Sequence, residues 1–149
     1  MRVAFDTNVL VSAVATRGLC ADVFNLVLAE HELIIGETVI AELKRVLRQK
    51  MRVPTEAVEE FEALLRQEGS VVGKTKALPI AIRDKADVSV LSEAAAGNAE
   101  VLVTGDRDLL EIAAALPLQG SRPNSWCMSR ESWLCWTHAQ LTTADSRAG

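Results

Sequence analysis

The chain has 149 residues, 49% of them apolar and 24% charged, and its formal net charge is −4. These values are typical of a single compact domain, and the negative charge excludes a general attraction to nucleic acid or to anionic membranes. The sequence contains no apolar run of about 18 residues and no signal-peptide pattern at its start, so we expect a cytoplasmic protein that does not associate with a membrane. The three cysteines form no close pair and are interpreted as reduced thiols (Cys20, Cys127 and Cys135).

The chain begins with a short apolar run over residues 3–5, which predicts a strand buried on both faces. The run ends at three polar residues, Asp6, Thr7 and Asn8. In an open parallel sheet, ligands bind outside the carboxyl ends of the strands, so Asp6 is a candidate site residue. Alternatively, Asp6 only caps or turns the chain after the strand.

Apolar residues at helical and strand spacing predict the next elements. In chain order, these are a crossover helix over 21–30, a strand over 31–35 and a helix with Thr38 as its N-cap. A further helix begins at Pro54 or Thr55 and ends at Gly69, and a brief strand follows over 70–73. The buried stripe of this further helix is expected to be Val58, Phe61, Leu64 and Leu65.

The same alternation continues after a connecting loop over 74–82. A fourth helix is predicted to begin with Asp87 as its N-cap and to end at Gly97. Residues 100–104 form the clearest buried strand and are followed by the polar segment 105–108, with a short helix expected over 109–116. This βα order predicts an α/β fold, a three-layer α/β/α sandwich with a central parallel sheet.

The C-terminal segment, residues 120–149, differs from the rest because it shows no sustained helix or strand period. We therefore expect a folded domain over 1–119 and an atypical, irregular tail. A tail that supplies no final strand would leave a sheet edge exposed, and tryptophan is favoured at interfaces. We predict a homodimer in which at least one tail tryptophan is buried (Trp126, Trp133 or Trp136).

Acidic residues stand where the predicted elements begin or end, at Asp6, Asp87 and Asp106, and Glu42 lies at the edge of the packed face of its helix. Carboxylates that converge at one sheet edge repel one another unless a cation lies between them. Oxygen ligands suit Mg²⁺ or Mn²⁺, and such an ion can share phosphate oxygens and activate water for phosphodiester hydrolysis. Taken singly, Asp87 is also consistent with a plain N-cap, and Glu42 is also consistent with a solvent-exposed helix residue.

Four segments carry the candidate acids: Val-Ala-Phe-Asp-Thr-Asn-Val-Leu-Val-Ser-Ala (3–13), Ala-Glu-Leu (41–43), Arg-Asp-Lys-Ala-Asp (83–87) and Val-Leu-Val-Thr-Gly-Asp-Arg-Asp-Leu (101–109). Together they resemble a PIN domain, in particular the VapC-like toxins of bacterial toxin–antitoxin pairs. The resemblance covers residues 1–116 and implies that residues 1–119 are a PIN-like nuclease domain.

The resemblance implies a metal-dependent ribonuclease that is inhibited by a small antitoxin protein. Its catalytic acids would be Asp6, Glu42, Asp87 and Asp106, of which the three aspartates bind the metal. It also implies an accessory acid and a polar group of residues that orient the ligands (Asp108; Thr7, Asn8 and Thr104).

Two features depart from this family pattern. Lys85-Ala86 interrupts the acidic cluster before the fourth helix, so that either Asp84 or Asp87 could be the third ligand; the spacing to Leu91 favours Asp87. The second departure is the tail, which has little of the expected strand character. A catalytically impaired binding module with the same fold therefore remains the alternative.

Basic residues lie near the candidate acids, although the net charge is negative. Phosphate contacts from Lys and Arg would position RNA without specifying its sequence. The same residues could instead form ion pairs on a solvated helix face, such as Glu42 with Arg45. The candidates for RNA binding are Lys44, Arg45, Arg48 and Lys85, with Lys74, Lys76 and Arg83 along the preceding loop.

Other classes of enzyme fit less well. A phosphoaspartate enzyme of the dehalogenase type requires an acid two residues beyond its nucleophile, where this chain has Asn8. A receiver domain requires a pair of acids just before the phosphorylated strand, where Met1 and Arg2 stand. The sequence has no glycine-rich phosphate loop, which excludes the usual nucleotide-cofactor folds.

Overall fold

The computed structural model describes residues 1–77, 84–106 and 109 of the chain. The tail over 120–149, its tryptophans, and all but the first residue of the helix expected over 109–116 lie outside the described residues. Within them, the elements are β1 (Arg2–Phe5), α1 (Thr7–Ala15), α2 (Leu19–Glu30), β2 (Glu32–Gly36), α3 (Glu37–Gln49), α4 (Thr55–Glu68), β3 (Gly69–Val72), α5 (Lys85–Ala96) and β4 (Val101–Val103).

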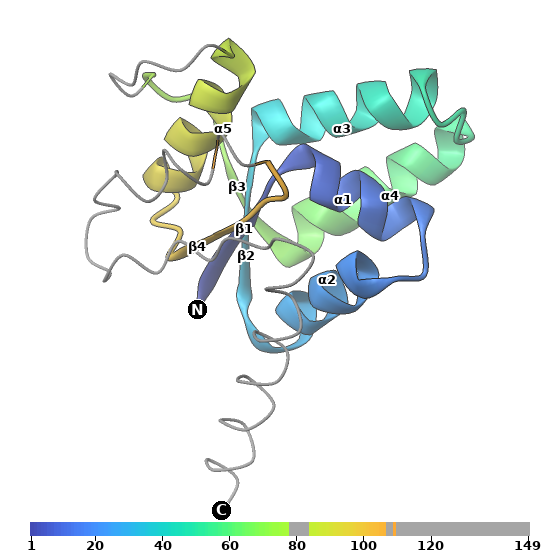
Figure 1. The fold of residues 1–149 in the computed structure, drawn as a ribbon, viewed down its shortest axis with the longest axis horizontal. Coiled ribbons are helices and arrows are strands. Elements are labelled where there is room, and N and C mark those ends of the chain that lie inside the picture. The colour runs from blue at the N-terminus through green and yellow to red at the C-terminus, as the bar shows by residue number, and fades with distance from the viewer. Residues whose placement is uncertain (78–83, 107–108, 110–149) are drawn as a thin grey trace, which may run out of the picture.

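The described strands form one parallel sheet in the order β3-β2-β1-β4. Figure 1 shows α1 to α4 on one side of this sheet and α5 on the other, which confirms the predicted three-layer arrangement. The chain moves outward from β1 to β2 and β3, and α5 then carries it back across the sheet to β4. The strand order therefore reverses between β1 and β4, and in such folds this is where ligands bind.

Burial differs between the two outer strands of the described sheet, β3 and β4. All residues of β4, and all but the first of β1 and of β2, are buried, whereas edge strand β3 is only partly covered. A parallel strand covered by helices on both faces reads as a continuous apolar run, which explains why the sequence predicted these strands well. On the side of α2 and α4, the rings of Phe5, Phe24 and Phe61 pack in series, with centroids 5.8 Å apart in each pair.

The structure corrects four local predictions. A helix, α1, begins at Thr7 directly after β1, where no helix was predicted. Thr38 is the second residue of α3 rather than its N-cap, which is Gly36. Asp87 lies inside the first turn of α5, and Asp84 is the N-cap. Leu64, expected in the buried stripe of α4, is 38% exposed.

In the described part of the chain, no single helix has the length and apolar character to cross a bilayer, and the α1–α2 pair that passes together is bent by 105°.

Candidate active site

Asp6 lies at the carboxyl end of β1 and is only 6% exposed. It is also the N-cap of α1, since its Oδ1 accepts a hydrogen bond of 2.7 Å from the backbone N–H of Thr7. The cap and site interpretations of Asp6 are therefore compatible, because one carboxylate oxygen serves the helix and the other faces β4. An N-cap must have extended backbone angles, and the last residue after a strand already has them (φ −72°, ψ 151°).

Thr104 connects Asp6 to the end of β4. Its hydroxyl donates to Asp6 Oδ2 over 3.0 Å and accepts from the backbone N–H of Asp106 over 3.1 Å. Thr104 is fully buried, so both hydrogen bonds are shielded from water. The polar residues that follow β1 and β4 are thus held together across the point where the strand order reverses.

Glu42 reaches the same region from α3. The hydroxyl of Thr7 donates to Glu42 Oε2 over 3.1 Å, so neighbouring residues 6 and 7 each contact one side of the site. The guanidinium of Arg45 lies 3.8 Å from Glu42 Oε1, one turn further along the helix. Asn8, in contrast, lies in the first turn of α1 and is exposed.

The two acids at the start of α5 have different roles. Asp84 caps the helix, with Oδ1 accepting 2.9 Å from the N–H of Ala86, and is exposed. Asp87, one turn later, is half-buried, and its pKa is raised from 3.8 to about 6. Burial is the main cause, followed by the negative charges of Asp84, Asp106, Asp6 and Glu42.

The pKa of Asp6 is also raised. Burial is the largest cause, partly offset by the hydrogen bonds from Thr104 and Thr7, and the charges of Asp106 and Glu42 raise it further. Neighbouring carboxylates disfavour each other's ionisation, so the charge contributions to these two pKa shifts, smaller than that of burial, indicate acids that lie near one another. The acids concerned are far apart in the sequence (Asp6, Glu42, Asp87 and Asp106).

The model of one protein family, described as the PIN domain, matches residues 2–108. The chain belongs to the PIN-domain family. This match spans every described strand and helix and confirms the resemblance of the sequence, and proteins of the family are generally nucleases.

A solved structure supports the same fold. A chain in the crystal structure of VapBC2 from Rickettsia felis, bound to a DNA fragment from the promoter, superposes with a TM-score of 0.52 at 18% sequence identity. The match covers 71% of the present chain and 88% of the other. The comparison with curated proteins gives no match.

Nucleases of the PIN family typically use divalent metals, and the donors in this PIN domain suit them. Carboxylate oxygens are the ligands that Mg²⁺ and Mn²⁺ prefer, and a cation would relieve the repulsion that raises the pKa values of Asp6 and Asp87. Within the described residues, however, no group of three or more His, Cys, Asp or Glu side chains is placed to hold one ion. The donor atoms are thus of the kind that suits a divalent metal, but the side chains would have to move closer together to hold it. Asp108, the expected accessory acid, lies outside the described residues.

The basic residues of α3 form ion pairs in this PIN domain. Lys44 pairs with Glu62 at 2.5 Å and Arg48 with Glu59 at 3.7 Å, both across to α4, while Arg45 is near Glu42 as described above. Lys85 is exposed at the first residue of α5. The ion-pair interpretation thus describes α3 in the free protein, and RNA binding by these residues stays a prediction.

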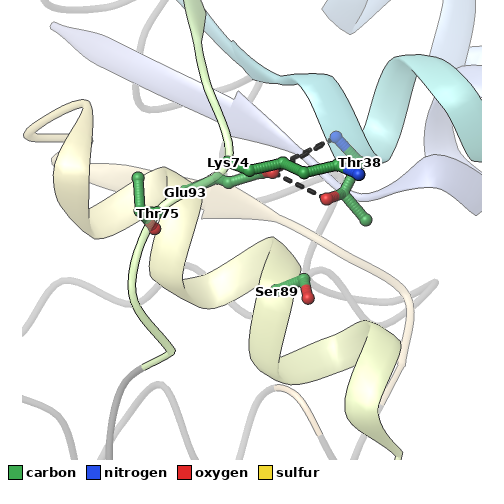
Figure 2. A pocket seen from close by; sticks show the side chains of 5 residues that line it. All are labelled: Thr38, Lys74, Thr75, Ser89 and Glu93. Atoms are coloured by element: carbon green, nitrogen blue, oxygen red, sulfur yellow. Dashed lines mark hydrogen bonds between the residues drawn. The ribbon is translucent and has the colours of Figure 1, made fainter.

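Sequence reasoning missed Glu93, an acid of α5 that is only 2% exposed. Its Oε1 accepts from the hydroxyl of Thr38 over 2.6 Å, and both carboxylate oxygens lie 3.2 Å from the N–H of Thr38 (Figure 2). Its negative charge therefore stabilises the positive, N-terminal end of α3, and this is the capping role that was expected of Thr38. The available signal was its place between Leu91 and Ala94, two residues predicted to face inward.

Proposed function

We propose that this PIN domain is a metal-dependent endoribonuclease and the toxin of a toxin–antitoxin pair. One observation carries the proposal: in a chain matched by the PIN model, Asp6 is held between Thr7 and Thr104 at the sheet edge while the charges of Glu42 and Asp106 act on it. A buried carboxylate with a raised pKa, fixed by two donors and surrounded by other acids, has the features of a catalytic site rather than of a simple cap.

In this proposal Asp6, Asp87 and Asp106 hold Mg²⁺ or Mn²⁺, which when bound supplies a Lewis acid for the phosphate and lowers the pKa of water. Thr7 and Thr104 keep the carboxylates of Glu42 and Asp6 in fixed orientations. Glu42 is less buried than Asp6, and it orients the attacking water or contributes to a second ion.

The proposed partners are RNA and a small protein antitoxin. The superposed chain comes from the structure of VapBC2, and VapC-like toxins are the branch that the sequence resembles. We also propose a homodimer in which the tail, residues 120–149, covers apolar surface. Light scattering on the full chain and on a chain ending at residue 119 tests this: dissociation or aggregation of the shorter chain supports it, and two monodisperse monomers contradict it.

One observation favours the alternative, a PIN-fold binding module without activity. In the described residues no three acids are grouped to hold one ion, which an impaired nuclease would also show. Cleavage separates the two functions, since a binding module would retain RNA but leave it intact.

The decisive experiment is cleavage of labelled single-stranded RNA by the purified protein with Mn²⁺ or Mg²⁺. We expect cleavage that stops with a chelator and is lost in Asp6→Asn and Asp106→Asn. Asp22→Asn, which changes an exposed acid on α2, is the matched control and should cleave normally. Intact RNA with both metals would contradict the proposed activity, and cleavage that survives both site substitutions would indicate a contaminating nuclease.

A further inference from the structure

A polar pocket lies at the carboxyl ends of β2 and β3. It has a volume of about 270 Å³ and is lined by Thr38, Lys74, Thr75, Ser89 and Glu93 (Figure 2). Thr38 belongs to α3, Ser89 and Glu93 belong to α5, and Lys74 and Thr75 follow β3. Every described element that ends or begins at this part of the sheet edge therefore contributes to the pocket.

The pocket and the acidic cluster are built on the same two helices. Glu42 lies one turn after Thr38 on α3, and Asp87 lies two residues before Ser89 on α5. In the sheet order β3-β2-β1-β4, the pocket is over β2 and β3, whereas Asp6 and Asp106 follow β1 and β4. A chain of nucleotides with one phosphate at the acids would thus place a neighbouring nucleotide over the pocket.

The hydrogen-bonding groups of the pocket are mainly acceptors. The Thr38 hydroxyl gives its proton to Glu93, and the Ser89 hydroxyl donates to the carbonyl of Lys85 over 3.3 Å. A hydroxyl whose proton is committed offers only its lone pairs, so both oxygens can accept but not donate. Together with the Glu93 carboxylate, the hydroxyl oxygens of Thr38 and Ser89 favour a ligand that donates hydrogen bonds from O–H or N–H groups.

A phosphate alone does not suit this lining. The start of α3, which would otherwise attract an anion, is already occupied by the Glu93 carboxylate. The ammonium of Lys74, the one cation among the five lining residues, extends past Glu93 toward Thr38 in Figure 2 and can contact a phosphate at the rim. The lining therefore matches a sugar hydroxyl inside and a phosphate outside.

We propose that this pocket binds the ribose of a nucleotide next to the scissile phosphate and recognises its 2′-hydroxyl. The 2′-hydroxyl is the donor that RNA has and DNA lacks, so the pocket selects RNA over DNA. The inference rests on the proposed nuclease function, since it takes the acidic cluster as the position of the phosphate. Ser89 and Thr38 accept from the ribose, and Lys74 binds the adjoining phosphate.

The test measures binding by fluorescence anisotropy in the Asp6→Asn background, with a short labelled single-stranded RNA and a series carrying one 2′-deoxy nucleotide at each position. We expect one position at which the deoxy substitution weakens binding about 3- to 10-fold, the worth of one hydrogen bond. Adding Ser89→Ala should weaken binding of the all-ribose RNA by a similar factor and remove the difference at that position. Lys74→Ala should weaken all members of the series equally.

Two exposed residues away from the pocket provide matched controls. Ser70→Ala changes a hydroxyl near the amino end of β3, where it donates to Glu32, and Lys50→Ala changes a lysine just after the C-terminal end of α3. Both should bind the series as the parent does. Equal binding of RNA and of every deoxy variant, or a deoxy effect that persists in Ser89→Ala, overturns the inference.

The two proposals fail in different ways. RNA cleavage by the wild-type protein without any 2′-hydroxyl effect would refute the ribose pocket and leave the nuclease intact. A 2′-hydroxyl effect that depends on Ser89, in a protein that cleaves nothing, would support the pocket and identify a binding module.

Discussion

At the scale of single residues, Asp6 combines two roles that usually belong to different side chains. It caps α1 through Thr7 and faces the other acids through the oxygen bound by Thr104. Capping requires only an oxygen acceptor, whereas metal binding and repulsion require the negative charge. Substitutions at this position can therefore separate folding from activity.

The first prediction compares Asp6→Asn with Asp6→Ala. Asparagine keeps an oxygen for the N–H of Thr7 and removes a buried charge, so the melting temperature should equal or exceed that of the wild type. Alanine removes the cap and should cost about 1 kcal/mol, or roughly 3 °C. Both variants should lose cleavage. A melting temperature of Asp6→Asn well below that of the wild type would contradict the charge repulsion.

The second prediction concerns pH and Asp87, whose pKa rises from 3.8 to about 6 on folding. A raised pKa means that the folded protein binds this proton more tightly than the unfolded chain. The resulting stability is complete below about pH 4 and is lost as the pH rises through about 6. Asp87→Asn does not titrate, so in metal-free buffer its melting temperature should gain on that of the wild type between pH 4 and pH 7.5.

We expect a gain of about 1 kcal/mol, or roughly 3 °C, after allowing for solvent around this half-buried group. Asp22→Asn, on exposed α2, should show no such pH dependence relative to the wild type. A constant difference between Asp87→Asn and wild type across this pH range would show that Asp87 ionises normally.

At the scale of elements, α3 and α5 are joined by Glu93, and Gly36 makes this contact possible. A Cβ added at Gly36 would overlap Glu93 Oε2 and lie 2.6 Å from Glu93 Cδ. The backbone of Gly36 (φ −86°, ψ 150°) is open to any residue, so glycine is required here for space and not for its conformation. Because α3 carries Glu42 and α5 carries Asp87, this contact sets how the two acids face each other.

The third prediction is that Gly36→Ala costs about 1–3 kcal/mol of unfolding free energy through steric overlap with Glu93. In a Glu93→Ala background the same change should cost much less, which a double-mutant cycle in denaturant measures. Gly73→Ala is the control, since a Cβ there meets no atom within 4 Å. Additive effects of Gly36→Ala and Glu93→Ala would show that the two helices are not coupled through this contact.

At the scale of the whole molecule, the strand order brings together acids from across the chain. Asp6 and Asp106 follow neighbouring strands β1 and β4, although 100 residues separate them in the sequence. The assembled site should therefore bind a cation that the unfolded chain cannot, and binding only to the native state stabilises it.

The fourth prediction is that Mn²⁺ raises the melting temperature of the wild-type protein. At a concentration of about 100 times Kd the gain should approach 2.7 kcal/mol, because the stabilisation follows RT ln(1 + [L]/Kd). Asp6→Asn and Asp106→Asn should lose most of this shift, whereas Asp22→Asn should retain it. An equal Mn²⁺ shift in all four proteins would place the metal elsewhere.

The sequence by itself determined the order of the described elements other than α1, and the positions of the acids along them. Runs such as 3–5 and 101–103 predicted buried strands because a parallel strand covered on both faces must be apolar throughout. The polar residues just after these runs were recognisable as site candidates because strand ends meet at one edge of a parallel sheet. These signals are local, so they could be read without knowing what packs against them.

Only the tertiary structure decided which polar group serves which helix end. Thr38 was a reasonable N-cap by sequence, but in the structure the backbone N–H of Thr38 contacts the carboxylate of Glu93 from α5. The raised pKa of Asp87 likewise depends on burial and on charges from four other acids. Partners as far apart as Thr38 and Glu93, which 55 residues separate, leave no trace in a short window of sequence, because burial and electrostatics depend on distance in space.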